Sequence, residues 1–321
     1  MNKGLIAVIG SAVTALVFLG IRMVSNSFVF PGIHIKSKDF ADITDRQNIQ
    51  LDDLHRVNRQ SIAVGDLKGC SYKCSNPESN LLSDKCIIIC GPNAAQAADI
   101  ASIHAMKTFL NKGATVFAID YRGFGYSKLP AATLRISQNT LYKDGETVYK
   151  YVSENLGYNS KNIIVFGFSL GGSVASHIAA YASSKGQALG GLIFASPING
   201  LYNVAKGLTC KPLAALARAT TMSALDTENN LKHVKYKDIP IFICSGDKKC
   251  DFLSLESTLL NQKIQKLGFT NVTTHIESNC SHNELNKMFE HSKAFHKSES
   301  SFYDYVNSLC SRSCMKNRKN I

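Results

Sequence analysis

The sequence predicts an α/β fold in which helices flank a mostly parallel central sheet, with a hydrophobic helix at the N-terminus. Three observations carry this prediction. Short apolar runs suit strands that are buried on both faces, helix-compatible stretches separate these runs, and an uncharged segment opens the chain. With 321 residues, 45% of them hydrophobic, the chain can bury one large core, so we expect a single main domain with extensions.

Four segments are expected along the chain. Residues 1–27 form a membrane anchor or signal segment, 28–60 a connecting segment, 61–300 the folded domain and 301–321 a basic tail that contains cysteines. In the domain, a hairpin over 61–73 precedes the buried strands. The strands and helices expected after it are Cys86–Cys90, a helix over 95–111, Thr115–Ile119, a helix over 141–156, Ile163–Phe166, Leu192–Ala195, an insertion of short helices over 199–233, Ile239–Gly246 and Val272–Ile276.

The most informative stretch is Asn162–Ser173, which reads Asn-Ile-Ile-Val-Phe-Gly-Phe-Ser-Leu-Gly-Gly-Ser. A short apolar strand is followed at once by glycines and then by a helix-compatible segment. Gly167 to Gly171 is therefore a G-x-S-x-G sequence in strand–turn–helix context, which is typical of a nucleophile elbow that presents Ser169 above a sheet. Both glycines are expected because a side chain at either position would clash in the tight turn.

The order of these elements resembles the α/β-hydrolase family. The segments that match are Ile87–Asn93, Ala114–Ser127, the elbow, Ile239–Asp247 and Ser278–Asn283. The Asp-Tyr-Arg-Gly-Phe-Gly-Tyr-Ser sequence of 120–127 is similar to that of membrane-anchored esterases and protein depalmitoylases in this family. The resemblance implies an α/β-hydrolase fold and a serine hydrolase that cleaves esters or thioesters through a Ser-His-Asp triad. No metal or organic cofactor is expected, because the sequence contains no ligand cluster with suitable spacing.

A serine nucleophile needs a histidine base, which in turn needs a carboxylate to fix its tautomer. The family order of Ser, acid, His and the Ser-His-Asn context single out His282 as the base. The acid is less well defined, because the family position three residues after Gly246 holds Lys249. Asp251 precedes a sequence similar to the segment that comes after the catalytic aspartate in the family, so it is our first choice, with Asp247 as the runner-up.

Two backbone N–H groups are expected to form the oxyanion hole. One belongs to Leu170, directly after the nucleophile, and the other to the loop that follows the Cys86–Cys90 strand. Pro92 in that loop has no N–H group, so we expect Asn93 to be the second donor, with Ala94 in reserve. In the neighbouring 120–127 loop, we expect Arg122 to hold a carboxylate outside the catalytic set.

The N-terminal segment Gly4–Ile21 contains 18 residues without a charge, between Lys3 and Arg22. As a helix it would measure about 27 Å, close to the thickness of a bilayer core. Its apolar stretch is long for a signal peptide and the nearest cleavage candidate, Ser25–Ser27, is a poor one, so an uncleaved membrane anchor is preferred to export through a signal peptide.

The formal net charge is +12 and the pI about 9.2, which suits contact with an anionic membrane. No zinc-finger, RNA-binding or helix-turn-helix pattern accompanies the basic residues, so no nucleic-acid partner is expected. Ten cysteines are too few for a disulfide scaffold. Cys86 and Cys90 would lie about 13 Å apart on one strand, beyond the reach of a disulfide, whereas Cys244 and Cys250 could close a loop.

The leading hypothesis is a membrane-anchored serine hydrolase that acts on an acyl lipid or an acylated protein. Two alternatives use the same fold. A catalytically inactive binding module is favoured by the displaced acid and by the proline in the oxyanion loop, and a serine peptidase would require a polar substrate pocket.

Overall fold

The computed structural model covers the whole chain and describes most of it. Side chains in the N-terminal helix are described from Thr14 onward, and Cys250, Asp251 and residues 310–321 lie outside the described residues. The described residues are 3–34, 57–93, 95–97, 99, 104–127, 129–208, 210–221, 223–247, 252–284, 288–289, 302 and 305–309.

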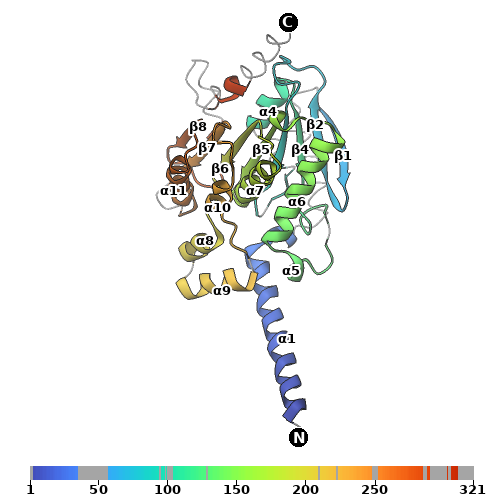
Figure 1. Ribbon diagram of the computed structural model, residues 1–321, viewed down its shortest axis with the longest axis vertical. Helices are drawn as coiled ribbons and strands as arrows, with labels where there is room; N and C mark the ends of the chain where they lie inside the picture. The colour runs from blue at the N-terminus through green and yellow to red at the C-terminus, as the bar shows by residue number, and fades with distance from the viewer. Residues whose placement is uncertain are drawn as a thin grey trace.

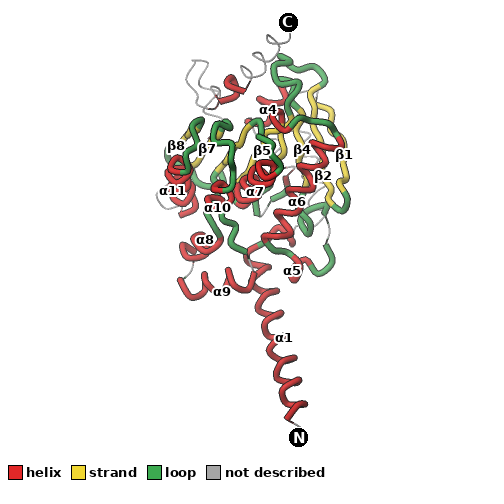
Figure 2. The backbone as a smooth tube through the Cα atoms, in the orientation of Figure 1, coloured by secondary structure: helices red, strands yellow, loops and turns green. Residues whose placement is uncertain are grey.

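An eight-stranded sheet forms the centre of the molecule (Figure 2). Its spatial order is β1-β2-β4-β3-β5-β6-β7-β8, with β1 and β2 antiparallel at one edge and parallel pairing from β4 to β8. The predicted strands and the opening hairpin are therefore confirmed. The strands are β1 Val57–Val64, β2 Leu67–Cys74, β3 Cys86–Cys90, β4 Thr115–Ile119, β5 Ile163–Phe168, β6 Gly191–Ala195, β7 Ile241–Gly246 and β8 Val272–Glu277.

Helices cover both faces of the sheet, and a long helix projects from one end of the molecule (Figure 1). The predicted helix over 141–156 is α6 followed by a π-helical turn, Tyr151–Asn155. The helices are α1 Lys3–Val29, α4 His104–Asn111, α5 Ala132–Arg135, α6 Gln138–Lys150, α7 Leu170–Ser184, α8 Leu201–Leu208, α9 Lys211–Thr221, α10 Thr227–Lys232 and α11 Phe252–Lys266.

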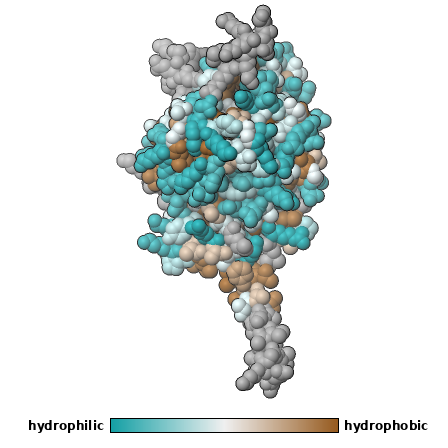
Figure 3. Space-filling model, in the orientation of Figure 1, coloured by the Kyte–Doolittle hydropathy of each residue, from teal (hydrophilic) through white to brown (hydrophobic). Residues whose placement is uncertain are grey.

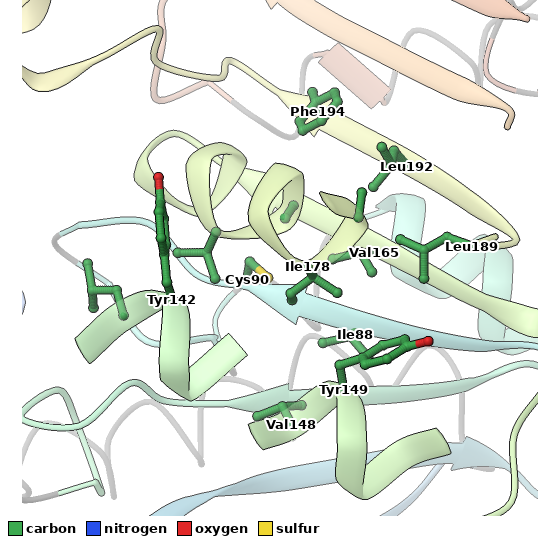
Figure 4. Close-up of a cluster of buried hydrophobic side chains, with 14 of the residues drawn as sticks. Ile88, Cys90, Tyr142, Val148, Tyr149, Val165, Ile178, Leu189, Leu192 and Phe194 are labelled. Atoms are coloured by element: carbon green, nitrogen blue, oxygen red, sulfur yellow. The ribbon is translucent and has the colours of Figure 1, made fainter. Parts of the chain in front are cut away.

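Two hydrophobic layers, one on each face of the sheet, make the core. Alternate residues of β5 point to opposite layers: Ile163 and Val165 pack with α6 and α7, whereas Ile164 and Phe166 pack on the other face. Figure 4 shows Val165 of the first layer among Ile178, Leu192 and Tyr149. Burial on both faces explains why these strands read as continuous apolar runs rather than as alternating ones.

The segment 199–233 folds into the short helices that we predicted, α8, α9 and α10. A buried amide ties α10 to the domain: Asn230 Nδ2 donates to the hydroxyl of Tyr142 at 2.8 Å, to Ser173 O at 3.0 Å and to Ser176 Oγ at 3.1 Å. Tyr142 lies on α6, Ser173 and Ser176 lie on α7, and all three residues are buried. The insertion is thus fixed to the rest of the domain at α10.

Helix α1 continues beyond the uncharged segment and docks on the domain. Asn26 is fully buried, and its Nδ2 donates to Thr133 O at 2.6 Å and to Ile136 O at 3.2 Å, next to α5. The hydroxyl of Thr220 on α9 donates to Ser25 Oγ at 2.9 Å. In the part of the chain whose side chains are described, no helix is both long enough and apolar enough to cross a membrane.

The described cysteines all carry thiols: Cys70, Cys74, Cys86, Cys90, Cys210, Cys244 and Cys280. All of them are buried except Cys210. The suggested partner of Cys244, Cys250, lies outside the described residues, as do Cys310 and Cys314. Burial raises the pKa of the Cys90 thiol to about 12, so this side chain behaves as a packed apolar group.

Candidate active site

The nucleophile elbow has the backbone geometry that the sequence predicts. Ser169 has φ 54° and ψ −116°, a conformation that residues with a side chain rarely adopt, and it stands between β5 and α7. A Cβ at Gly167 would lie 2.5 Å from Gly171 O, and a Cβ at Gly171 would lie 2.0 Å from Cys90 O. Glycine is therefore required at both flanks of Ser169 because backbone atoms occupy the space of a side chain.

The structure brings Ser169 and His282 together across 113 positions of sequence. His282 Nε2 lies 2.9 Å from Ser169 Oγ, and only 4% of the histidine is exposed. The imidazole stacks on the ring of Phe168 with 5.5 Å between centroids, which fixes the ring plane beside the elbow. When Nε2 accepts a hydrogen bond from the Ser169 hydroxyl, the neutral ring carries its proton on Nδ1, which is buried.

Of the two candidate acids, the structure places only Asp247. Asp247 is exposed at the end of β7, and its Oδ1 accepts the backbone N–H of Asn279 at 2.5 Å. This bond holds the turn that leads from β8 to His282. The preferred acid, Asp251, lies outside the described residues, so its role stays a prediction.

The two expected oxyanion donors, Leu170 and Asn93, belong to different elements. Leu170 is the first residue of α7, where the helix dipole favours a developing negative charge. Asn93 lies in the loop after β3, and its amide Nδ2 donates to Val29 O at the end of α1. Asn93 O accepts the N–H of Gly32 at 2.9 Å, while Ala94 lies outside the described residues.

Asp120 joins the oxyanion loop to the loop over 120–127. Its Oδ1 accepts the N–H of Ala97 at 3.0 Å, and its Oδ2 accepts the N–H of Tyr126 at 3.2 Å. Burial raises the pKa of Asp120 to about 6, against the lowering effect of these two bonds. A Cβ at Gly125 would lie 2.2 Å from Asp120 Oδ2, so the second glycine of the loop leaves room for this carboxylate.

Arg122 holds a carboxylate, as expected, and that carboxylate is Asp144 of α6. The Arg122 backbone N–H donates to Asp144 Oδ2 at 2.8 Å, and Arg122 Nε donates to Asp144 Oδ1 at 2.7 Å. The distance from Arg122 Nη2 to Asp144 Oδ1 is 2.6 Å. The pair fixes the loop against α6 and makes no contact with Ser169. Within the described part of the chain, no three His, Cys, Asp or Glu side chains cluster as a metal site requires.

The comparisons with known proteins agree with this geometry. A profile of the serine aminopeptidase S33 family matches residues 100–238. A solved α/β-hydrolase from Vibrio vulnificus superposes with a TM-score of 0.67 at 21% identity, covering 88% of this chain and 91% of that one. The chain has the α/β-hydrolase fold.

Two further proteins show similarity to this chain, one in fold and one in sequence. An esterase of Pyrobaculum calidifontis superposes with a TM-score of 0.55 at 15% identity, covering 88% of this chain and 94% of the esterase. The multifunctional-autoprocessing repeats-in-toxin of Vibrio vulnificus is 29% identical over 207 residues, which is 62% of this chain. The match spans 4% of the length of that toxin.

Sequence reasoning about this α/β-hydrolase missed the contact between the N-terminal helix and the oxyanion loop. The helix ends at Val29, and the turn Pro31–His34 places Gly32 so close to Phe124 that a Cβ would lie 2.1 Å from the ring. The Pro31-Gly32 pair marks the end of the helix. No local pattern, however, indicates that the following turn would meet residues some 60 to 90 positions later.

Proposed function

We propose that this α/β-hydrolase is a serine hydrolase that cleaves a carboxylic ester or thioester carrying a fatty-acyl group. The observation that carries the proposal is the 2.9 Å contact between Ser169 Oγ and His282 Nε2 at a strained elbow. An inactive binding module has no need of this contact or of the strained serine that makes it.

The reaction follows from the geometry of these groups. His282 Nε2 takes the hydroxyl proton while Ser169 Oγ forms a bond to the acyl carbon, and the N–H groups of Leu170 and Asn93 hold the oxyanion. The alcohol or thiol leaves with the proton from His282. Water, deprotonated by the same imidazole, then attacks the acyl-enzyme and releases the fatty acid and the free serine. Asp251 is proposed to stabilise the imidazolium, with Asp247 as the alternative.

Labelling with a fluorophosphonate probe tests this proposal on the full chain in detergent. The parent and the variants Ser169→Ala, His282→Ala, Asp251→Ala and Asp247→Ala are compared at equal folded concentration. Labelling of the parent, its loss in the Ser169 and His282 variants and its reduction in one aspartate variant support the triad and identify the acid. A folded parent that does not label refutes the catalytic proposal.

A serine peptidase is the second candidate, since the matching family profile is described as a serine aminopeptidase. An aminopeptidase uses the same acyl-enzyme chemistry but must bind a free amino group, whereas an esterase of fatty acids needs an apolar acyl site. Comparing hydrolysis of leucine p-nitroanilide with that of p-nitrophenyl butyrate separates the two. Faster cleavage of the anilide would favour the peptidase.

We also propose that Gly4–Ile21 anchors the enzyme in a membrane, with export through a signal peptide as the alternative. Support comes from the 18 uncharged residues and from the net charge of +12, which suits an anionic lipid surface. The substrate is accordingly an acyl lipid or an acylated protein at that surface. Extraction of membranes with alkaline carbonate tests the anchor, because an uncleaved anchor stays in the pellet and a peripheral or processed chain is released.

A further inference from the structure

A groove of about 520 Å³ runs between α1 and α9 at the end of the molecule where the long helix emerges. This volume is within the range of about 300–1,000 Å³ typical of small-molecule sites. The walls of the groove are almost entirely apolar, and the Thr220–Ser25 hydrogen bond joins its two helices. Residues that line it include Gly20, Val24 and Val29 of α1 and Leu213, Leu216 and Ala217 of α9.

One residue of the groove contacts the loop that carries a candidate oxyanion donor. Val29 lines the groove, and its carbonyl oxygen accepts the hydrogen bond from the Asn93 amide. Asn93 is two residues from Gly91, whose carbonyl oxygen lies 2.7 Å from the position of a Cβ on Gly171 in the elbow. Through Val29 the groove therefore adjoins the loop after β3, and Gly91 of this loop packs against the elbow.

The groove extends along α1 into the uncharged N-terminal segment, since Val17, Gly20 and Ile21 also line it. Large apolar side chains are exposed there on both helices: Val24 is 58% exposed, Leu213 55% and Leu216 46%. Figure 3 shows hydrophobic residues gathered at this end of the molecule, where α1 leaves the domain. A contiguous apolar surface of this kind on a folded domain indicates a binding site for an apolar partner.

We propose that the groove between α1 and α9 holds the acyl chain of a lipid substrate, with the carbonyl group directed toward Asn93 and Ser169. The proposal rests on the proposed function and deepens it, because it assigns the acyl subsite. The open end follows the same helix as the uncharged segment, so the lipid enters from the side of the bilayer. Helix α1 then serves both as the anchor and as one wall of the substrate site.

Gly20 offers a way to fill the groove without disturbing the fold. A Cβ at Gly20 would have no described neighbour within 4 Å, so a large side chain can project into the groove from α1. Ala217→Phe narrows the groove from α9. Leu19 is 43% exposed on α1 and does not line the groove, so Leu19→Trp is the matched control for Gly20→Trp.

The experiment compares hydrolysis of p-nitrophenyl palmitate and p-nitrophenyl butyrate by the full chain and these three variants in detergent micelles. We expect the palmitate-to-butyrate ratio of kcat/KM to fall by about tenfold or more in Gly20→Trp and Ala217→Phe, since several methylene contacts are lost. The ratio should stay within about twofold of the parent in Leu19→Trp. Retained butyrate hydrolysis shows that each variant is folded and that its triad is intact.

Three results would overturn the inference. A parent that hydrolyses both esters while both groove variants keep its ratio refutes the groove but leaves the proposed function standing. An equal fall in Leu19→Trp assigns the effect to the micelle-facing surface of α1 rather than to the groove. A folded parent that hydrolyses neither ester refutes the proposed function, and the acyl groove with it.

Discussion

The strained backbone at Ser169 predicts that this residue lowers the stability of the enzyme. Its φ of 54° and ψ of −116° are accessible to glycine but costly for any residue with a Cβ, by about 1–3 kcal/mol. Replacing alanine by glycine at this position removes that strain. The greater freedom of glycine in the unfolded chain, however, destabilises the folded state by roughly 0.5–1 kcal/mol. We expect Ser169→Gly to be more stable than Ser169→Ala by about 1 kcal/mol.

The comparison of these two variants isolates the strain. Both lose the hydroxyl and its contact with His282, and the Ser169 side chain caps no N–H group of α7, so these effects cancel. Guanidinium unfolding of the full chain, followed by fluorescence at constant detergent, gives the difference in free energy. Neither variant should react with a fluorophosphonate. If the glycine variant is no more stable than the alanine variant, the argument from backbone strain is wrong.

Three further predictions test the surroundings of the elbow. Gly171→Ala should destabilise the domain by about 3 kcal/mol or more and reduce ester hydrolysis, because the new Cβ would lie 2.0 Å from Cys90 O. Thermal unfolding measures the loss of stability, and initial rates measure the loss of hydrolysis. Iodoacetamide at pH 8 should modify the exposed Cys210 in the folded protein and leave Cys90 unmodified, because Cys90 is buried and its thiol has a pKa of about 12. Mass spectrometry of peptides measures both modifications, and modification of Cys90 would contradict the prediction. Asp120 has a pKa of about 6 in the folded state against 3.8 when unperturbed, so the folded state holds its proton more tightly and stability falls as the pH rises from 4 to 6. Relative to Asp120→Asn, the parent should lose about 2 kcal/mol of unfolding free energy over this interval, and equal pH profiles of the two proteins would refute the assignment.

The parts of the fold and site that sequence could predict are those in which the signal is local. The strand, elbow and helix around Ser169 are consecutive, and burial on both faces of the sheet produces apolar runs that can be recognised one at a time. His282 could be predicted from its neighbours because it comes after a strand in a characteristic turn. The structure confirms its contact with Ser169.

The features that sequence could not predict depend on contacts between distant segments. The loop after β7 departs from the usual spacing, so neither Asp247 nor Asp251 could be chosen by counting, and the structure places only Asp247. The buried Asp120 that joins two loops looks in the sequence like any turn aspartate. The docking of Val29 on Asn93 involves residues 64 positions apart, and no periodicity or motif encodes such a pairing.

The hydrogen bonds that join the end of α1 to Asn93 have a thermodynamic consequence. Docking of α1 and binding of a ligand at the oxyanion loop are linked, because the end of α1 is hydrogen-bonded to Asn93 in that loop. If docking of α1 strengthens ligand binding by a certain free energy, the bound ligand must stabilise the docked helix by the same free energy. A force on the N-terminal helix, or removal of this helix, would therefore change the affinity of a ligand that binds at Ser169. A chain that begins at Gly32 lacks α1 and the Val29 carbonyl that binds Asn93. We therefore expect such a truncated domain and the full chain to bind the same ligand with different affinities.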